Sequence, residues 1–90
     1  MMTKITMIRY EIPSFVIQTE ARDYVQARPS LPQSEAITEW MKSKYVAWIE
    51  DKIGTPFDFI TNTERMYFDV SFDDESFADA FLKKMGGKVH

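Results

Sequence analysis

A chain of 90 residues that is 44% apolar, with three glycines and no low-complexity run, has the composition of one globular domain over residues 1–90. It has no cysteine, which excludes disulfides and thiolate metal sites, and its net charge of −3 with scattered basic residues argues against a phosphate-driven nucleic-acid binder. No apolar run approaches the ~18 residues of a membrane span, and no signal-peptide core is evident, so we expect a cytoplasmic protein.

The first predicted element is a strand from Lys4 to Ile12, which Pro13 ends because proline cannot donate to a sheet ladder. Successive side chains of a strand point to opposite faces. One face carries Thr6, Ile8, Tyr10 and Ile12, and the other carries Ile5, Met7, Arg9 and Glu11. Because its first half is apolar on both faces, we expect a central strand.

Residues 14–32 allow two interpretations. Residues 15–17 are apolar and could form a short strand, whereas residues 17–25 place an apolar side chain on one face of a helix every three or four positions. We predict a strand-like start, a helical turn near Glu20 to Gln26, and a loop punctuated by Pro29 and Pro32.

The clearest predicted element is a helix from Ser34 to Ile53. Its apolar positions form one broad stripe, and Ser30 or Ser34 is expected to cap its start. Gly54 is placed to end it, and the following Thr55-Pro56 prevents continuation. The stripe consists of Ile37, Met41, Tyr45, Trp48, Ile49 and Ile53.

Two strands and a second helix complete the chain. The strands are predicted at Phe57 to Thr61 and Arg65 to Phe72, joined by a polar hairpin connection. After residue 72 the apolar spacing changes from two to three and four, which predicts a helix that Asp73 caps. Gly86-Gly87 stops this helix and leaves room for only a stub of a final strand at residues 88–90.

The order of these elements predicts an α+β fold of the ferredoxin-like, or split βαβ, type. In this arrangement two helices pack on one face of an antiparallel sheet. The fourth strand is expected to be short, or to be replaced by an edge strand from the insertion at residues 14–32. The same architecture hosts many unrelated functions, so it assigns none by itself.

Residues for catalysis are scarce. The only histidine is His90, and the usual nucleophile–base pairs are missing because there is no cysteine. The acidic run at residues 73–75 is better explained as the first turn of a helix than as a metal site. We therefore expect a non-enzymatic protein without cofactor or metal.

Residues 65–72 loosely resemble the main signature of RNA-recognition motifs. Four positions match, namely Arg65, Tyr67, Val70 and Phe72. Met66 and Phe68 replace the small residues of the signature, and Asp69 stands where a base-stacking phenylalanine is needed. Because an acid at that position repels phosphate, nucleic-acid binding is the least supported function.

The face of the sheet that no helix covers is the most suggestive surface. It is predicted to carry the apolar residues Ile5, Met7, Ile60 and Tyr67, surrounded by Arg9, Glu11, Asp58 and Asp69. An apolar patch with a charged rim has the composition of an interface. Two residues on the flank of the long helix, Trp40 and Val46, are secondary interface candidates, although a Trp there is more often covered by a neighbouring segment such as residues 14–32.

We therefore predict a small interaction or regulatory module that forms a homodimer through this face, because small disulfide-free domains often gain stability by self-association. A different protein partner is also possible, and no membrane contact is expected. The alternative is a small-ligand-binding protein or minor enzyme with a pocket between the sheet and the helices. Its candidate lining residues are Tyr10, Tyr24, Tyr45 and Trp48. Single-stranded nucleic-acid binding ranks third.

Overall fold

The computed structural model describes residues 5–90. Its strands are β1 (Thr6–Glu11), β2 (Asp58–Asn62), β3 (Tyr67–Phe72) and β4 (Lys88–Val89), and its helical segments are α1 (Ser14–Val16), α2 (Arg22–Gln26), α3 (Gln33–Met41), α4 (Ala47–Lys52) and α5 (Glu75–Lys84). Two π-helical turns, η1 (Ile17–Ala21) and η2 (Lys42–Val46), join α1 to α2 and α3 to α4 without a break. The described chain thus folds into three continuous helices and a sheet.

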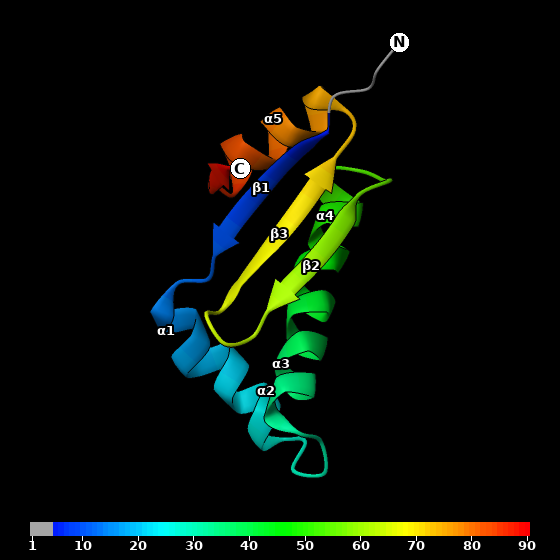
Figure 1. Cartoon of the computed structure of the whole chain (residues 1–90). Coiled ribbons are helices and arrows are strands. Elements are labelled where there is room, and N and C mark those ends of the chain that lie inside the picture. The colour runs from blue at the N-terminus through cyan, green and yellow to red at the C-terminus, as the bar shows by residue number, and fades with distance from the viewer. Residues whose placement is uncertain (1–4) are drawn as a thin grey trace.

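The four strands form an open antiparallel sheet in the order β2-β3-β1-β4. In Figure 1 the sheet lies in front of α4 and α5, and α2 with the start of α3 projects past one end of it. The molecule is accordingly long, with extents of 48 × 23 × 22 Å. This arrangement confirms the predicted mixed α+β class with an antiparallel sheet.

The alternation in β1 and β3 positions the core. Ile8, Phe68, Val70 and Phe72 are fully buried, whereas their sequence neighbours in the strands are partly exposed. Rings from the helices meet these residues directly, since Tyr45 lies 4.9 Å from Phe68 and Phe81 lies 6.0 Å from Phe72 between centroids. The predicted division of β1 and β3 into a face toward the core and a more exposed face is therefore confirmed. The predicted start of the first strand at Lys4 lies outside the described residues.

The prediction of a strand-like start at residues 15–17 is wrong. Ser14 begins a helix directly after Pro13, whose carbonyl accepts hydrogen bonds from the amides of Val16 and Ile17 at 3.1 and 3.2 Å. The helix then continues to Gln26, and α2 packs against α3. Val16 and Ala21 are buried in the common core. These tertiary contacts explain why a helix forms despite the strand preference of this short apolar segment. The sheet therefore carries three helices in place of the expected two.

The long helix spans Gln33–Lys52, one residue earlier at each end than predicted. Its predicted cap is wrong, because Pro32 occupies the N-cap position and no side chain caps the helix. The predicted stop is confirmed. Gly54 has a φ of +134°, which side-chain-bearing residues rarely adopt, and its amide donates to the carbonyl of Ile49 at 2.9 Å.

The fourth strand is short, as expected, and residues 14–32 do not replace it. Lys88 and Val89 pair antiparallel with Arg9 and Ile8. The chain approaches β1 closely at Gly87, where an added Cβ would come within 2.9 Å of the carbonyl oxygen of Arg9. Glycine at this position thus permits β4 to dock. No helix of residues 5–90 is long and apolar enough to cross a membrane.

The N-cap residue of α5 is Asp74, so the prediction that Asp73 caps this helix is wrong. The Asp74 carboxylate accepts hydrogen bonds from the amide and hydroxyl of Ser76 at 2.9 and 2.6 Å. These bonds hold the pKa of Asp74 below its ordinary value of 3.8. Because the ionised form is the one that the fold stabilises, this contribution is present above the pKa of the unfolded chain and is lost as the pH falls through the lower pKa of the folded state.

We therefore expect Asp74→Ala to lower the urea midpoint more than Asp73→Ala at neutral pH, because only Asp74 caps an amide. The difference between the two variants should shrink as the pH is lowered through and below 4, as the carboxyl group becomes protonated. Urea titrations of both variants and the wild type at a series of pH values measure this. Equal midpoints for the two variants at neutral pH would contradict the assignment of the cap.

Candidate functional site

The open face of the sheet is ordered by the register of its strands. Met7 of β1 lies opposite Ser71 of β3, Arg9 lies opposite Asp69, and Glu11 lies opposite Tyr67. On the other side of β3, the residues of β2 opposite Ser71, Asp69 and Tyr67 are Asp58, Ile60 and Asn62, in that order. Lys88 extends the middle row beyond Arg9. Three rows of side chains therefore cross the sheet, and the middle one reads Ile60, Asp69, Arg9 and Lys88.

The centre of the open face is an ion pair within one chain. Arg9 Nε and Nη2 donate to the two carboxylate oxygens of Asp69 at 2.8 and 3.1 Å, which is the bidentate geometry that arginine favours. The hydrogen bond to Asp69 raises the pKa of Arg9. The guanidinium carbon also lies 4.1 Å from the ring centre of Tyr67, whose hydroxyl accepts a hydrogen bond from Asn62 at 3.2 Å. These contacts join four side chains within one chain, namely those of Arg9, Asp69, Tyr67 and Asn62.

This geometry corrects the predicted layout of the patch. Arg9 and Asp69 were expected in a charged rim around an apolar centre, but they occupy the middle row next to Ile60. Arg9 was also expected to meet Asp69 or Glu11 of a second copy, yet it already pairs with Asp69 of its own chain. Of the apolar residues, Ile60 lies on the edge strand β2, Met7 and Tyr67 lie on the central strands, and Ile5 precedes β1. Ile5 is 67% exposed, Ile60 is 64% exposed, and Met7 is partly buried.

Trp40 is not a surface residue. It is 4% exposed and packs edge-to-face against Tyr45, with 5.9 Å between ring centroids. It belongs to the same core cluster as Val16 and Ala21, so the interpretation that residues 14–32 help to cover it is favoured and that of an interface anchor is wrong. Val46 is partly exposed and keeps its position on the flank of the helix.

The four aromatic residues proposed to line a ligand pocket belong instead to packed contacts. Tyr10 and Tyr45 lie 5.7 Å apart and both contact Phe68, while Trp48 contacts Phe81. Burial raises the pKa of Tyr45 well above its ordinary value. Tyr24 donates its hydroxyl proton to Glu39 at 3.0 Å on the outside of the helical hairpin. These residues therefore support the core and the hairpin.

A groove does lie elsewhere, between the helical hairpin and the β2–β3 turn. Its volume is about 580 Å³, within the range of small-ligand sites. Apolar side chains form part of its lining, and glutamine, arginine, threonine and glutamate side chains supply the polar part. The lining residues are Ile17, Gln18, Ala21, Arg22, Val25, Gln26, Gln33, Ile37, Thr63, Glu64 and Met66. Sequence patterns could not predict it because three separate segments meet there, namely the helix of residues 14–26, α3 and the β2–β3 turn.

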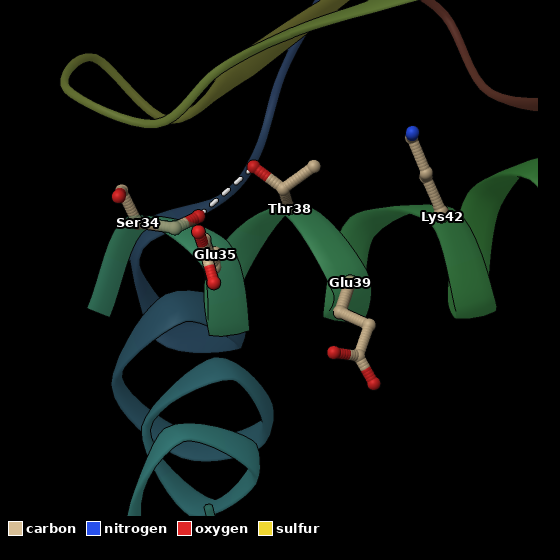
Figure 2. A pocket seen from close by; sticks show the side chains of 5 residues that line it. All are labelled: Ser34, Glu35, Thr38, Glu39 and Lys42. Carbon is tan, nitrogen blue, oxygen red and sulfur yellow. Dashed lines mark hydrogen bonds between the residues drawn. The ribbon is translucent and has the colours of Figure 1, made fainter. Parts of the chain in front are cut away.

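A second depression, of about 270 Å³, follows the outside of α3 and is lined by side chains of that helix and the following turn (Figure 2). Thr38 donates its hydroxyl proton to the carbonyl of Ser34 at 2.9 Å, and Figure 2 shows Thr38 and Lys42 directed away from Glu39. Glu39 is already engaged by Tyr24 and lies 3.8 Å from Arg28. The polar groups of this depression therefore do not converge on a common point.

Comparisons with known proteins give no match, whether with family models, with curated proteins or with solved structures. Within residues 5–90, no group of three or more acidic or histidine side chains is placed to hold a metal ion. The open face and the groove are therefore the two candidate functional sites.

Two residues of the open face were missed by sequence reasoning, namely Asn62 and Lys88. Asn62 was assigned to the hairpin connection, but it is the last residue of β2, and its side-chain carbonyl also accepts a hydrogen bond from the amide of Arg65 at 2.8 Å. An asparagine that precedes a turn commonly makes such a bond, so the sequence did hold a signal for it. Lys88 reaches the face only through the pairing of β4, which the pattern could not specify.

Proposed function

We propose that the protein is a small non-enzymatic interaction module that forms a homodimer through the open face of its sheet. The observation that carries this proposal is the 64% exposure of Ile60, which shares a row of the open face with Asp69 and Arg9. Ile5, which is 67% exposed, lies just before the start of β1. Removing one such isoleucine from water contributes on the order of 1–2 kcal/mol, and a two-fold interface counts each residue twice.

The central ion pair is compatible with burial in such an interface. The Asp69 side chain is 13% exposed and that of Arg9 is 32% exposed, so much of the cost of removing these charges from water is met within one chain. A second copy would therefore cover a neutral, internally paired centre. The apolar side chains of Met7 and Ile60, together with Tyr67, would supply the contact area.

We also propose that the fold is of the ferredoxin-like type. The support is that β1 and β3 are the central strands, that the long helix lies between β1 and β2 in the chain, and that α5 lies between β3 and β4. This type leaves one sheet face without helices. The helix of residues 14–26 is then an addition to the split βαβ pattern.

The groove supports a second candidate function, the binding of a small ligand. Its size and its mixed lining favour a small molecule with an apolar part and a polar end that the glutamine side chains and Arg22 could meet. Because its lining comes from the helical hairpin and the β2–β3 turn, this function does not depend on the open face.

The test of the proposed function is Met7→Glu, which places a charge on the open face away from the ion pair. We expect it to lower the average mass of the protein in sedimentation at micromolar concentrations, because the carboxylate would have to lose water in the interface. The matched control is Phe15→Glu, which adds the same charge to a 69% exposed apolar residue of α1. Equal masses for wild type and Met7→Glu at every concentration, or dissociation by Phe15→Glu alone, would contradict the proposal.

A further inference from the structure

Within residues 5–90, no strand pairs with the outer backbone edge of β2, and the hydrogen bonds of the sheet show which residues line that edge. The amide of Ile12 donates to the carbonyl of Met66, and that of His90 donates to the carbonyl of Met7. Because paired residues alternate along an antiparallel ladder, the even-numbered residues of β1 point to β3 and the odd-numbered ones to β4. The same alternation makes residues 67, 69 and 71 of β3 point to β2.

The partners of these residues in β2 are Asn62, Ile60 and Asp58. Their backbone groups are therefore used by β3, and those of Phe59 and Thr61 point outward. In the part of the chain that the structure describes, β3 is the only strand that pairs with β2. In Figure 1 β2 forms one margin of the sheet, and α4 lies behind it.

This edge lacks the features that usually prevent strand addition. Natural edges are blunted by lysine, proline or bulges. β2 contains no lysine, arginine or proline, its only charge is Asp58 at one end, and its middle residue, Ile60, is 64% exposed. An edge of this composition favours pairing with another strand.

We propose that β2 pairs antiparallel with β2 of a second copy, with Ile60 opposite Ile60. In this register Phe59 lies opposite Thr61 of the other copy, so the outward backbone groups of both residues form reciprocal hydrogen bonds. The two Ile60 residues form the non-hydrogen-bonded pair, in which side chains approach most closely. The open faces of the two copies then lie on the same side of a continuous sheet.

Side-chain chemistry selects this register. Asp58 lies opposite Asn62 of the other copy, where an amide can donate to a carboxylate. A register centred on Asp58 would place two carboxylates opposite each other, and a shift by one residue would put side chains of opposite faces together. Centring on Ile60 also uses all five residues of the strand.

This edge contact goes beyond the proposed function, because its hydrogen bonds form along the backbone edge of β2, whereas the proposed dimer is formed by side chains of the open face. Its two-fold axis is perpendicular to the sheet, whereas that of a face-to-face dimer lies parallel to it. The two contacts can therefore coexist, and each can be removed without the other. The test is best made in the Met7→Glu variant, in which contact between open faces is disfavoured.

In that variant we expect a residual dimer in sedimentation. Adding Asn62→Asp should weaken it by about tenfold, because two pairs of facing carboxylates replace two favourable pairs. Adding Asp58→Asn as well should restore the dimer, since the carboxylate and the amide have then only exchanged places. The control for added charge is Gln18→Glu, at an exposed position of η1, which should leave the dimer unchanged.

Thr61→Pro provides a second test, because it removes an outward N–H without removing a hydrogen bond to β3. It should also abolish the residual dimer, with circular dichroism confirming that the sheet is kept. A Met7→Glu variant that is monomeric at high micromolar concentration would overturn the edge contact, as would a charge exchange that does not restore association. If Thr61→Pro weakens association while Met7→Glu does not, the edge contact stands and the open-face dimer fails.

Discussion

Phe68→Ala is expected to lower the free energy of unfolding by about 3–5 kcal/mol, the cost typical of truncating a buried aromatic residue. Phe68 is fully buried in the middle of β3. Its ring lies 4.6 Å from Phe59, 4.9 Å from Tyr45 and 5.3 Å from Tyr10, and thus joins β2, the long helix and β1. The cavity that this substitution leaves could collapse only if several elements moved at once. The loss is a large part of the about 5–15 kcal/mol by which domains are commonly stable.

Urea unfolding followed by circular dichroism measures this loss. The matched control is Phe15→Ala, the same substitution at a 69% exposed position of α1, which should change the free energy of unfolding by less than about 0.5 kcal/mol. Similar losses in the two variants would contradict the placement of the core between the sheet and the helices.

Trp40→Ala is expected to cost a similar amount, about 3–5 kcal/mol, for a different reason. Trp40 belongs to the core cluster that also contains Val16 and Ala21 of the first helix. Its removal should therefore loosen the helical hairpin that projects past the sheet, while β1 and β3 keep their own core contacts. The distinguishing result is a loss of stability without a loss of self-association by the molecules that remain folded.

Thermal unfolding and sedimentation of Trp40→Ala, with Glu50→Ala as the control on the same helix, separate the two roles. Glu50 is exposed, so its truncation should have a small effect on both measurements. A Trp40→Ala variant that unfolds like the wild type but dissociates more readily would return Trp40 to the set of interface residues.

The elements with long, regular periodicity could be predicted from the sequence. β1, β3 and the helix of residues 33–52 each turn one face toward the core, and burial imposes the spacing that the sequence shows. The same reasoning placed Ile8 and Phe68 inside and Arg9 and Asp69 on the open face. The glycines at 54 and 86–87 marked real ends because their backbone angles require glycine.

Residues 14–26 could not be predicted because their conformation depends on a partner. The apolar run at residues 15–17 is too short to distinguish strand from helix, and only contact with the core cluster around Trp40 selects the helix. The helix caps were predicted wrongly for a related reason. Several polar residues near the start of a helix can cap it, and the backbone turn decides which one does. The turn selects Asp74 over Asp73 in α5, and it places Pro32 at the N-cap position of α3.

The composition of the open face could be predicted, but its layout could not. Alternation assigns a residue to a face, whereas the pairing of Arg9 with Asp69 follows from the register between β1 and β3. The turn that sets the neighbouring register contains Met66 at a φ of +57°, an uncommon angle for a residue with a side chain. The groove beside this turn was missed for the same reason, since no local pattern predicts where the hairpin meets the helices.

The most direct measurement of the central claim is the concentration dependence of amide resonances in a ¹⁵N-labelled sample diluted from millimolar to low micromolar. Self-association through the open face predicts that the resonances of Met7, Arg9 and Glu11 move with concentration, because all three side chains lie on that face and away from the β2 edge. Those of Phe15 and Arg22 on the first helix should stay in place. Resonances of β1 that are independent of concentration, while those of the first helix move, would contradict it.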